Sequence, residues 1–147
     1  MLITVLRIIM RNKIVLDTNC LLMALSKHGN YFDIWQGLKE GKYILCVSNE
    51  ILAEYSEILT SKTNAIVADN VIFALAGSEF VEYVDPHFHL ELIKIDPDDN
   101  KFVDCAFAAN AKYIVSNDKH FDVLKSIPYP TIDVIKIDEF LIELKSM

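Results

Sequence analysis

The stretch from Lys13 to Leu25, KIVLDTNCLLMAL, decides the expected fold. It opens with a short apolar run that contains β-branched residues, which predicts a buried strand. The run ends at Asp17, and Thr18 or Asn19 can then cap a helix formed by the second apolar run. A carboxylate at the C-terminal end of a buried strand lies where open α/β sheets bind ligands, so Asp17 is the first candidate site residue.

The rest of the chain continues this alternation of apolar strand and helix. Further strands are expected over 42–48, 90–95, 112–118 and 131–137, and 79–86 is either a short strand or an extended link. Further helices are expected over 34–41, 49–60, 63–76, 99–111 and 138–144. Because the strands are apolar throughout, the pattern predicts an α/β fold whose central, mostly parallel sheet is covered on both faces.

Length and composition fit one ordered domain. The chain has 147 residues, of which 52% are hydrophobic and 24% are charged, so it can bury a core and is too apolar for disorder. We expect the domain over residues 13–147 and an N-terminal extension or arm over 1–12, with Met10 as an alternative natural start. The apolar part of this extension is too short to span a membrane and lacks the features of a signal peptide.

Cysteine spacing and net charge limit the functions that the chain can have. The three cysteines, Cys20, Cys46 and Cys105, lie in separate apolar stretches without CxxC spacing, which indicates structural thiols in a reducing, cytoplasmic compartment. The net charge of −7 is unlike that of proteins which bind phosphate backbones through basic patches. A carboxylate cluster that holds a cation would resolve this conflict, since the ion supplies positive charge where nucleic acid binds.

Acidic residues recur at one edge of the expected sheet. Asp17 and Asp118 end strands, and Asp99 opens a helix directly after the 90–95 segment, so all three share an edge if the sheet is parallel. Glu54 in the middle of its helix can point to the same edge, and Asp104 can reach it from the first turns of the Asp99 helix. Converging carboxylates repel one another unless a cation binds, and an all-oxygen set suits Mg²⁺ or Mn²⁺.

Two other assignments stay open for the acidic and histidine residues. Asp17, Asp99 and Asp118 each occupy a position where aspartate is also favoured as a helix N-cap. His87 and His89 would share one face of an extended segment, and with a nearby carboxylate they form an alternative zinc set that lacks any cysteine or further histidine.

Together the motifs resemble the PIN-domain family, metal-dependent nucleases with a three-layer α/β/α fold. The resemblance runs from KIVLDTN (13–19) to KYIVSNDKHF (112–121), and is greatest to the bacterial toxins of toxin–antitoxin systems. Asp17 in LDTN matches the family's first acid, Glu54 in SNEILAEYSEIL its helical acid, and Asp118 the acid after its later strand. Asp98, Asp99 and Asp104 are all candidates for the third acid of the family's pattern. Asp99 is preferred because of its spacing to Asp118, and Asp98 is then expected to be a turn residue.

The resemblance implies an endoribonuclease that hydrolyses phosphodiester bonds of single-stranded RNA with Mg²⁺ or Mn²⁺. It implies that Asp17, Asp99 and Asp118 bind the metal, with Asp104 as an additional ligand. Glu54 would bind the metal, directly or through water, or orient the attacking water.

Residues around the acids take supporting roles under the same resemblance. Asn19 and Ser116 would hydrogen-bond to the carboxylates or to phosphate. Candidate backbone-phosphate contacts near this edge are Lys27, His28, Lys101, Lys119 and His120.

The expected partners follow from this function and from its rivals. They are single-stranded RNA, an antitoxin protein that covers the acidic site, and a second copy of the chain packed through apolar helices; a membrane is not among them. A non-catalytic RNA-binding or protein-interaction module could retain the same fold, but it is expected to lose at least one acid. A phosphoacceptor domain would need a lysine and a hydroxyl at later strand ends, and IVSNDK (114–119) does not supply that order.

Overall fold

The computed structural model describes residue 2 and residues 12–147. The expected arm over 1–12 lies almost wholly outside these residues and stays a prediction. The strands are β1 (Asn12–Leu16), β2 (Tyr43–Val47), β3 (Val81–Tyr83), β4 (Tyr113–Val115) and β5 (Val134–Ile135). The helices are α2 (Thr18–Leu25), α3 (Phe32–Lys39), α4 (Asn49–Lys62), α5 (Ala65–Ala76), α6 (Asn100–Ala109) and α7 (Ile137–Lys145), with 3₁₀ segments η1 (Pro97–Asp99) and η2 (Lys119–Ser126). Across the described part of the chain, no helix is long and apolar enough to cross a bilayer.

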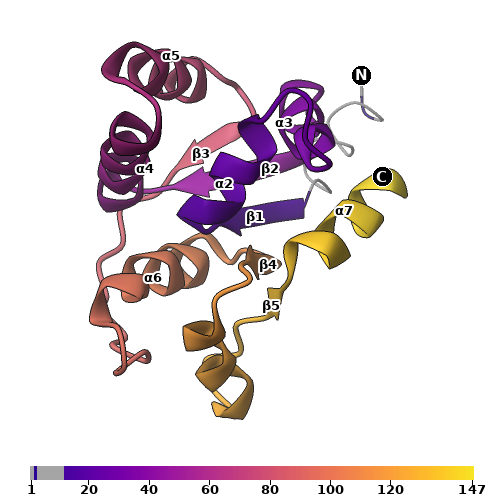
Figure 1. Cartoon of the computed structure of the whole chain (residues 1–147). Helices are drawn as coiled ribbons and strands as arrows, with labels where there is room; N and C mark the ends of the chain where they lie inside the picture. The colour runs from indigo at the N-terminus through magenta and orange to yellow at the C-terminus, as the bar shows by residue number, and fades with distance from the viewer. Residues whose placement is uncertain (1, 3–11) are drawn as a thin grey trace.

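The strands form one sheet in the order β3-β2-β1-β4-β5, and every pair is parallel. The predicted parallel α/β fold is therefore confirmed, with helices around a central sheet (Figure 1). The chain moves from β1 outward to β3, and then returns past β1 to β4. Because crossovers between parallel strands are right-handed, this reversal distributes the helices over both faces and creates a switch point between β1 and β4.

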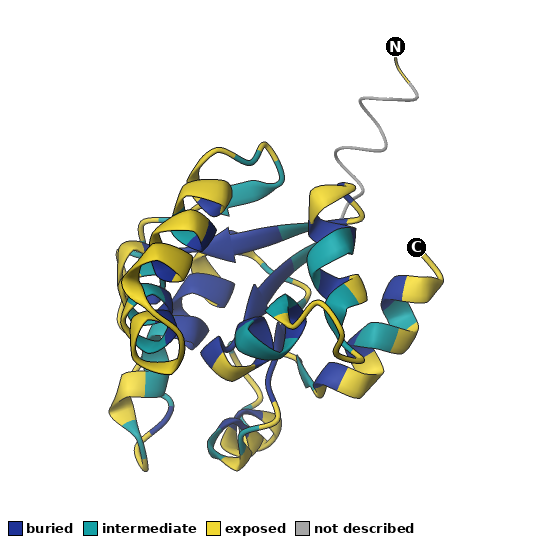
Figure 2. Ribbon diagram, turned by 45° about the horizontal axis from the view of Figure 1, so that its top comes forward, coloured by how far each residue is buried: buried dark blue, intermediate teal, exposed yellow. Residues whose placement is uncertain are grey.

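The two central strands β1 and β2 are buried on both faces. Ile14, Val15 and Leu16 are all inaccessible to solvent, as are Leu45 and its two successors in β2. The dark strands enclosed by paler helices in Figure 2 show the same distribution. Burial on both sides explains why the sequence of these strands shows an apolar run and no alternation.

The 90–95 segment corrects one sequence-based expectation, because it is not a strand. The side chain of Asn100 forms the hydrogen bonds that a neighbouring strand would otherwise offer to Ile93. Its Oδ1 accepts from the Ile93 N–H at 2.9 Å, and its Nδ2 donates to the Ile93 carbonyl at 2.9 Å. Ile95 at the end of the segment is 76% exposed. The apolar residues here therefore anchor a loop to the start of α6. The last strand is also shorter than the predicted 131–137 and covers only β5.

Helix α4 is fixed across the end of β1 by one buried hydrogen bond. The hydroxyl of the fully buried Tyr55 donates to the carbonyl oxygen of Leu16 at 2.5 Å. Leu16 precedes Asp17, and Tyr55 follows Glu54, so this bond sets the distance between the first strand-end acid and the helical acid.

Tyr55→Phe should destabilise the fold, because it removes this hydrogen bond without changing the shape of the ring. We expect a loss of about 1–2 kcal/mol in the free energy of unfolding, measured by urea denaturation. Tyr129→Phe is the matched control, since Tyr129 is 82% exposed and should leave the unfolding midpoint unchanged. Equal midpoints for the two variants would contradict the role given to Tyr55.

Candidate metal centre

Asp17 lies at the switch point and is 7% exposed. Its Oδ1 accepts from the backbone N–H of Thr18 at 2.8 Å. Asp17 therefore caps α2, which confirms the N-cap alternative for this residue and not a cap at Thr18 or Asn19. Its Oδ2 accepts from the Ser116 hydroxyl at 2.7 Å. Burial raises the pKa of the Asp17 carboxyl, and the charges of Asp118 and Glu54 raise it further, although the hydrogen bonds from Ser116 and Thr18 oppose this.

Ser116 connects the ends of β4 and β1. Besides donating to Asp17, its hydroxyl oxygen accepts from the backbone N–H of Asp118 at 3.0 Å. Asp118 in turn caps η2 by accepting from the His120 N–H at 2.9 Å. The two strand-end acids therefore lie at the same edge of the sheet, joined through one buried hydroxyl.

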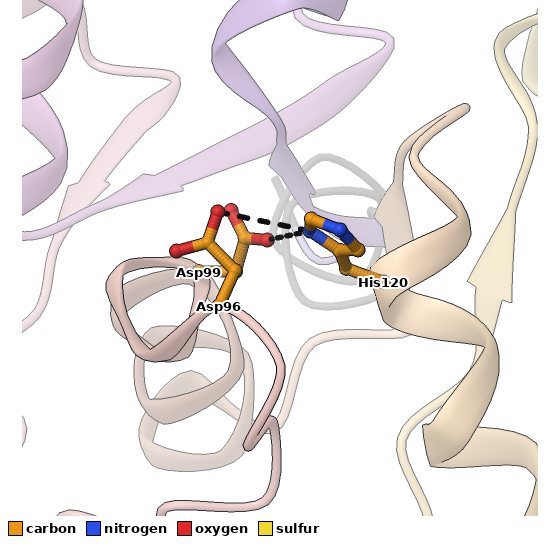
Figure 3. Close-up of side chains that lie close together, drawn as sticks. All are labelled: Asp96, Asp99 and His120. Carbon is orange, nitrogen blue, oxygen red and sulfur yellow. Dashed lines mark hydrogen bonds and ion pairs between the residues drawn. The ribbon is translucent and has the colours of Figure 1, made fainter.

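Asp99 brings the start of α6 to the same edge and lies in a cluster with Asp96 and His120 (Figure 3). His120 Nδ1 lies 3.1 Å from Asp99 Oδ2, 3.7 Å from Asp96 Oδ2 and 3.5 Å from Asp118 Oδ1. One potential ligand atom each from Asp96, Asp99 and His120 lie within 4.8 Å of one another. The sequence analysis missed Asp96 and considered His120 only as a phosphate contact. The available signal was their spacing, three residues before Asp99 and two after Asp118.

The charges of this cluster shift the titration of its members. Burial raises the pKa of Asp99 to about 6; the hydrogen bond with His120 opposes the rise, and the nearby charges of Asp96, Asp118 and Asp17 add to it. The hydrogen bond with Asp99 raises the pKa of His120 above its ordinary value, against a smaller opposite effect of desolvation. Several carboxylates thus share a region that has too little positive charge to balance them, which is the electrostatic condition that a bound cation would relieve.

Glu54 reaches this region from α4 with both carboxylate oxygens engaged. Oε2 accepts from the Thr18 hydroxyl, and Oε1 pairs with the Lys101 ammonium at 2.8 Å. Lys101 also pairs with Asp98 at 3.0 Å, and its side chain is only 10% exposed. Lys101, expected to contact substrate, is therefore held beside the acids by the protein itself.

Three further predicted site residues have other surroundings, and their roles stay predictions. The Asp104 carboxylate, 6% exposed, accepts from the Leu90 N–H at 3.0 Å and lies 3.3 Å from His89 Nδ1. Asp104 therefore anchors the 84–93 loop, and its role as an additional metal ligand stays a prediction. Asn19 on α2 and Lys119 at the start of η2 are both exposed.

The donor set at this edge suits a hard divalent ion. Among the described residues, the ligand atoms that lie close enough to share one ion are those of Asp96, Asp99 and His120. That Asp17 and Asp118 bind the same ion stays a prediction. Carboxylate oxygen is the preferred ligand of Mg²⁺ and Mn²⁺, whereas imidazole is the more usual ligand of zinc, iron, copper and nickel. The arrangement can therefore hold a metal ion next to a carboxylate on a rigid helix.

Comparison with known proteins identifies the family of the chain. A family model described as PIN domain matches residues 13–120, which is more than half of the chain. The chain therefore belongs to the PIN domain family. No curated protein matches the sequence.

Solved structures with the same fold are distant in sequence. VapBC2 from Rickettsia felis, solved bound to a promoter DNA fragment, is 20% identical with a TM-score of 0.59, covering 84% of this chain and 98% of that one. DNA-bound VapBC from Salmonella typhimurium is 15% identical with a TM-score of 0.56, covering 86% and 98%. The PIN domain endonuclease Utp24 is 19% identical with a TM-score of 0.50, covering 84% of each chain. At these identities the likeness establishes the fold.

Asp99→Asn should stabilise the protein in the absence of metal. The pKa of Asp99 rises from 3.8 to about 6 on folding, so its ionised form is disfavoured in the folded chain. The protonated Asp99 is favoured in the folded chain, so its contribution to stability is lost as the pH rises from 3.8 to about 6. Asparagine does not ionise, so the variant avoids this loss at pH 7. We expect a melting temperature in EDTA higher by about 2–4 °C, measured by thermal denaturation.

The response to Mn²⁺ should distinguish the unmodified protein from Asp99→Asn. The metal should raise the melting temperature of the unmodified protein, with the rise fading below about pH 6 as Asp99 takes up its proton, and should barely affect Asp99→Asn. Asp122→Asn, an exposed change in η2, is the control and should behave like the unmodified protein. A lower melting temperature for Asp99→Asn in EDTA, together with an undiminished response to Mn²⁺, would contradict this assignment.

Proposed function

We propose that the protein is a metal-dependent endoribonuclease that hydrolyses phosphodiester bonds of single-stranded RNA. The observation that carries this proposal is the set of contacts that links the acids near the switch point of the sheet. Ser116 contacts Asp17 and Asp118, His120 lies beside Asp118 and Asp99, and Thr18 contacts Glu54. Membership of the PIN domain family supports the proposal, as does the likeness to Utp24, whose structure is described as that of an endonuclease.

Asp17, Asp99 and Asp118 would hold Mg²⁺ or Mn²⁺ at this edge. The ion would supply positive charge to the reacting phosphate and lower the pKa of a bound water. Ser116 fixes the orientation of Asp17 through its hydroxyl, and the N–H of Thr18 fixes the other carboxylate oxygen. Both contacts lower the pKa of Asp17 and so oppose the effect of burial, which raises it.

Glu54 is the candidate general base for the attacking water. The Thr18 hydroxyl and the Lys101 ammonium hold its two oxygens, so the carboxylate is oriented before substrate arrives. Lys119 would contact a phosphate of the strand, and Asn19 would contribute a hydrogen bond at the exposed rim, whereas Lys101 would keep Glu54 in place.

The proposed physiological role is that of a toxin in a toxin–antitoxin pair. Two of the structural neighbours are VapBC proteins, and this supports an antitoxin as the protein partner. The alternative, a non-catalytic RNA-binding module, would not need a full acid set, and all four acids are present in the chain.

The proposal is tested by incubating a labelled single-stranded RNA pool with the purified protein in Mn²⁺, Mg²⁺ or EDTA. Cleavage should depend on the metal and fall at least about a hundredfold in Asp17→Asn and in Glu54→Gln, because each removes a group that acts on the reacting phosphate or water. Glu57→Gln is the control, since Glu57 is exposed on the same helix and should cut like the unmodified protein.

Cleavage that persists in EDTA, or that survives in Asp17→Asn, would show a contaminating nuclease or another site and would overturn the proposal. Absence of cleavage together with absence of Mn²⁺ binding would leave the four acids as helix caps and favour the non-catalytic module.

A further inference from the structure

A cavity of about 270 Å³ lies beside the acidic cluster, between the start of α4, the 84–93 loop and α6. Its polar lining includes Asn49, Glu50, Asp85, His89, Lys101 and Asp104. The volume lies just below the range of pockets that hold drug-sized molecules, so it suits a single planar ring system.

Lys101 forms the wall between this cavity and the candidate metal centre. It lines the cavity and also pairs with Glu54 at 2.8 Å. Glu50 lies four residues before Glu54 on α4, about 6 Å along the helix axis. A ligand in the cavity is therefore within about one nucleotide of the acidic cluster.

The charges around the cavity exclude a phosphate and favour a hydrogen-bond donor. Three carboxylates, those of Glu50, Asp85 and Asp104, border it. The Lys101 ammonium does not offset them, because Glu54 and Asp98 already bind it. Carboxylates recognise the amino groups of bases, and the amide of Asn49 adds both a donor and an acceptor.

Exposed aromatic surface adjoins the cavity. A second hollow of about 300 Å³ shares Asp85 and Asp104 with it and is also lined by Phe88 and Phe107. Phe88 is 69% exposed, and the side chain of His89 is 68% exposed. Proteins that read single-stranded RNA stack unpaired bases on such rings and hydrogen-bond to their edges.

We propose that the cavity seats one nucleobase that carries an exocyclic amino group, from a nucleotide next to the cleaved phosphate of a single-stranded RNA. The proposal rests on the proposed nuclease function and adds a base preference to it. Adenine, cytosine and guanine present amino hydrogens to the carboxylates of the cavity. Uracil has no amino group, and its carbonyl oxygens would face those carboxylates.

The test compares four short single-stranded RNAs that differ only at one position beside the cut, identified first by sequencing the products of a random pool. In Mn²⁺ the protein should cut the uridine-bearing RNA at least about tenfold more slowly than the best of the other three. Asp85→Asn and Asn49→Ala should reduce this preference to about twofold. Glu57→Gln is the control for a carboxylate of α4 that does not line the cavity, and should keep the full preference.

A binding arm separates this inference from the nuclease proposal. The inactive Asp17→Asn protein is titrated with the same four RNAs by fluorescence anisotropy, and the same order of preference is expected. The proposal that the cavity binds a base would be overturned if all four RNAs were bound and cut equally, or if both cavity variants kept the full preference. Metal-dependent cutting in the same experiment would still support the nuclease proposal. Absence of cutting with an intact binding preference would overturn the nuclease proposal and keep the proposed base binding. N-acetylarginine amide serves as a probe for a protein partner that inserts an arginine. Binding of this probe in the cavity, without discrimination among the four RNAs, would overturn the proposed base binding in favour of a protein partner.

Discussion

The parallel pairing of β1 with β4 is the constraint on which the rest of the structure depends. It joins strands that are far apart in the sequence and places their C-terminal ends side by side at the point where the sheet reverses its order. The hydrogen bond from Ser116 to Asp17 closes this junction at 2.7 Å. A slip in this pairing would separate Asp17 from Asp118 and leave Asp17 as a buried carboxylate with one fewer donor.

The same junction brings several carboxylates together, and their burial and mutual repulsion destabilise the folded chain. Asp17 and Asp99 both have raised pKa values, chiefly through burial and with added repulsion from neighbouring acids. Lys101 and His120 offset part of that repulsion through their pairs with Glu54 and Asp99. Arrangements of this kind persist where a site must receive a cation, and they lower the stability of the metal-free protein. Under the proposed function, a net charge of −7 is compatible with an acidic partner such as RNA, because the contact would run through the metal.

The sequence was informative wherever one local pattern determined the structure. The apolar, unbroken runs of β1 and β2 predicted parallel strands buried on both faces, and the acids at strand ends predicted where Asp17 and Asp118 lie. The 90–95 segment misled because its apolar content is that of a strand, whereas its backbone bonds go to a side chain, that of Asn100. Which partner satisfies a backbone group depends on packing between distant segments, and a local pattern does not encode it.

Side-chain partners across the site were beyond the sequence for the same reason. The two contacts on Glu54 join residues 36 and 47 positions away, and His120 meets Asp99 from 21 positions away. Asp104 was expected to reach the other acids from the first turns of its helix. The sequence did not predict the contacts of its carboxylate with the Leu90 N–H and His89 in the 84–93 loop.

The central claim is that Asp17, Asp99 and Asp118 converge to hold one divalent ion. The most direct measurement is the anomalous scattering of Mn²⁺ in crystals of the full chain grown with the metal. The account predicts an anomalous peak within coordination distance, about 2–2.5 Å, of carboxylate oxygens from these three residues. A crystal with a peak at His87 and His89 instead, or with none at the switch point despite saturating Mn²⁺, would contradict it.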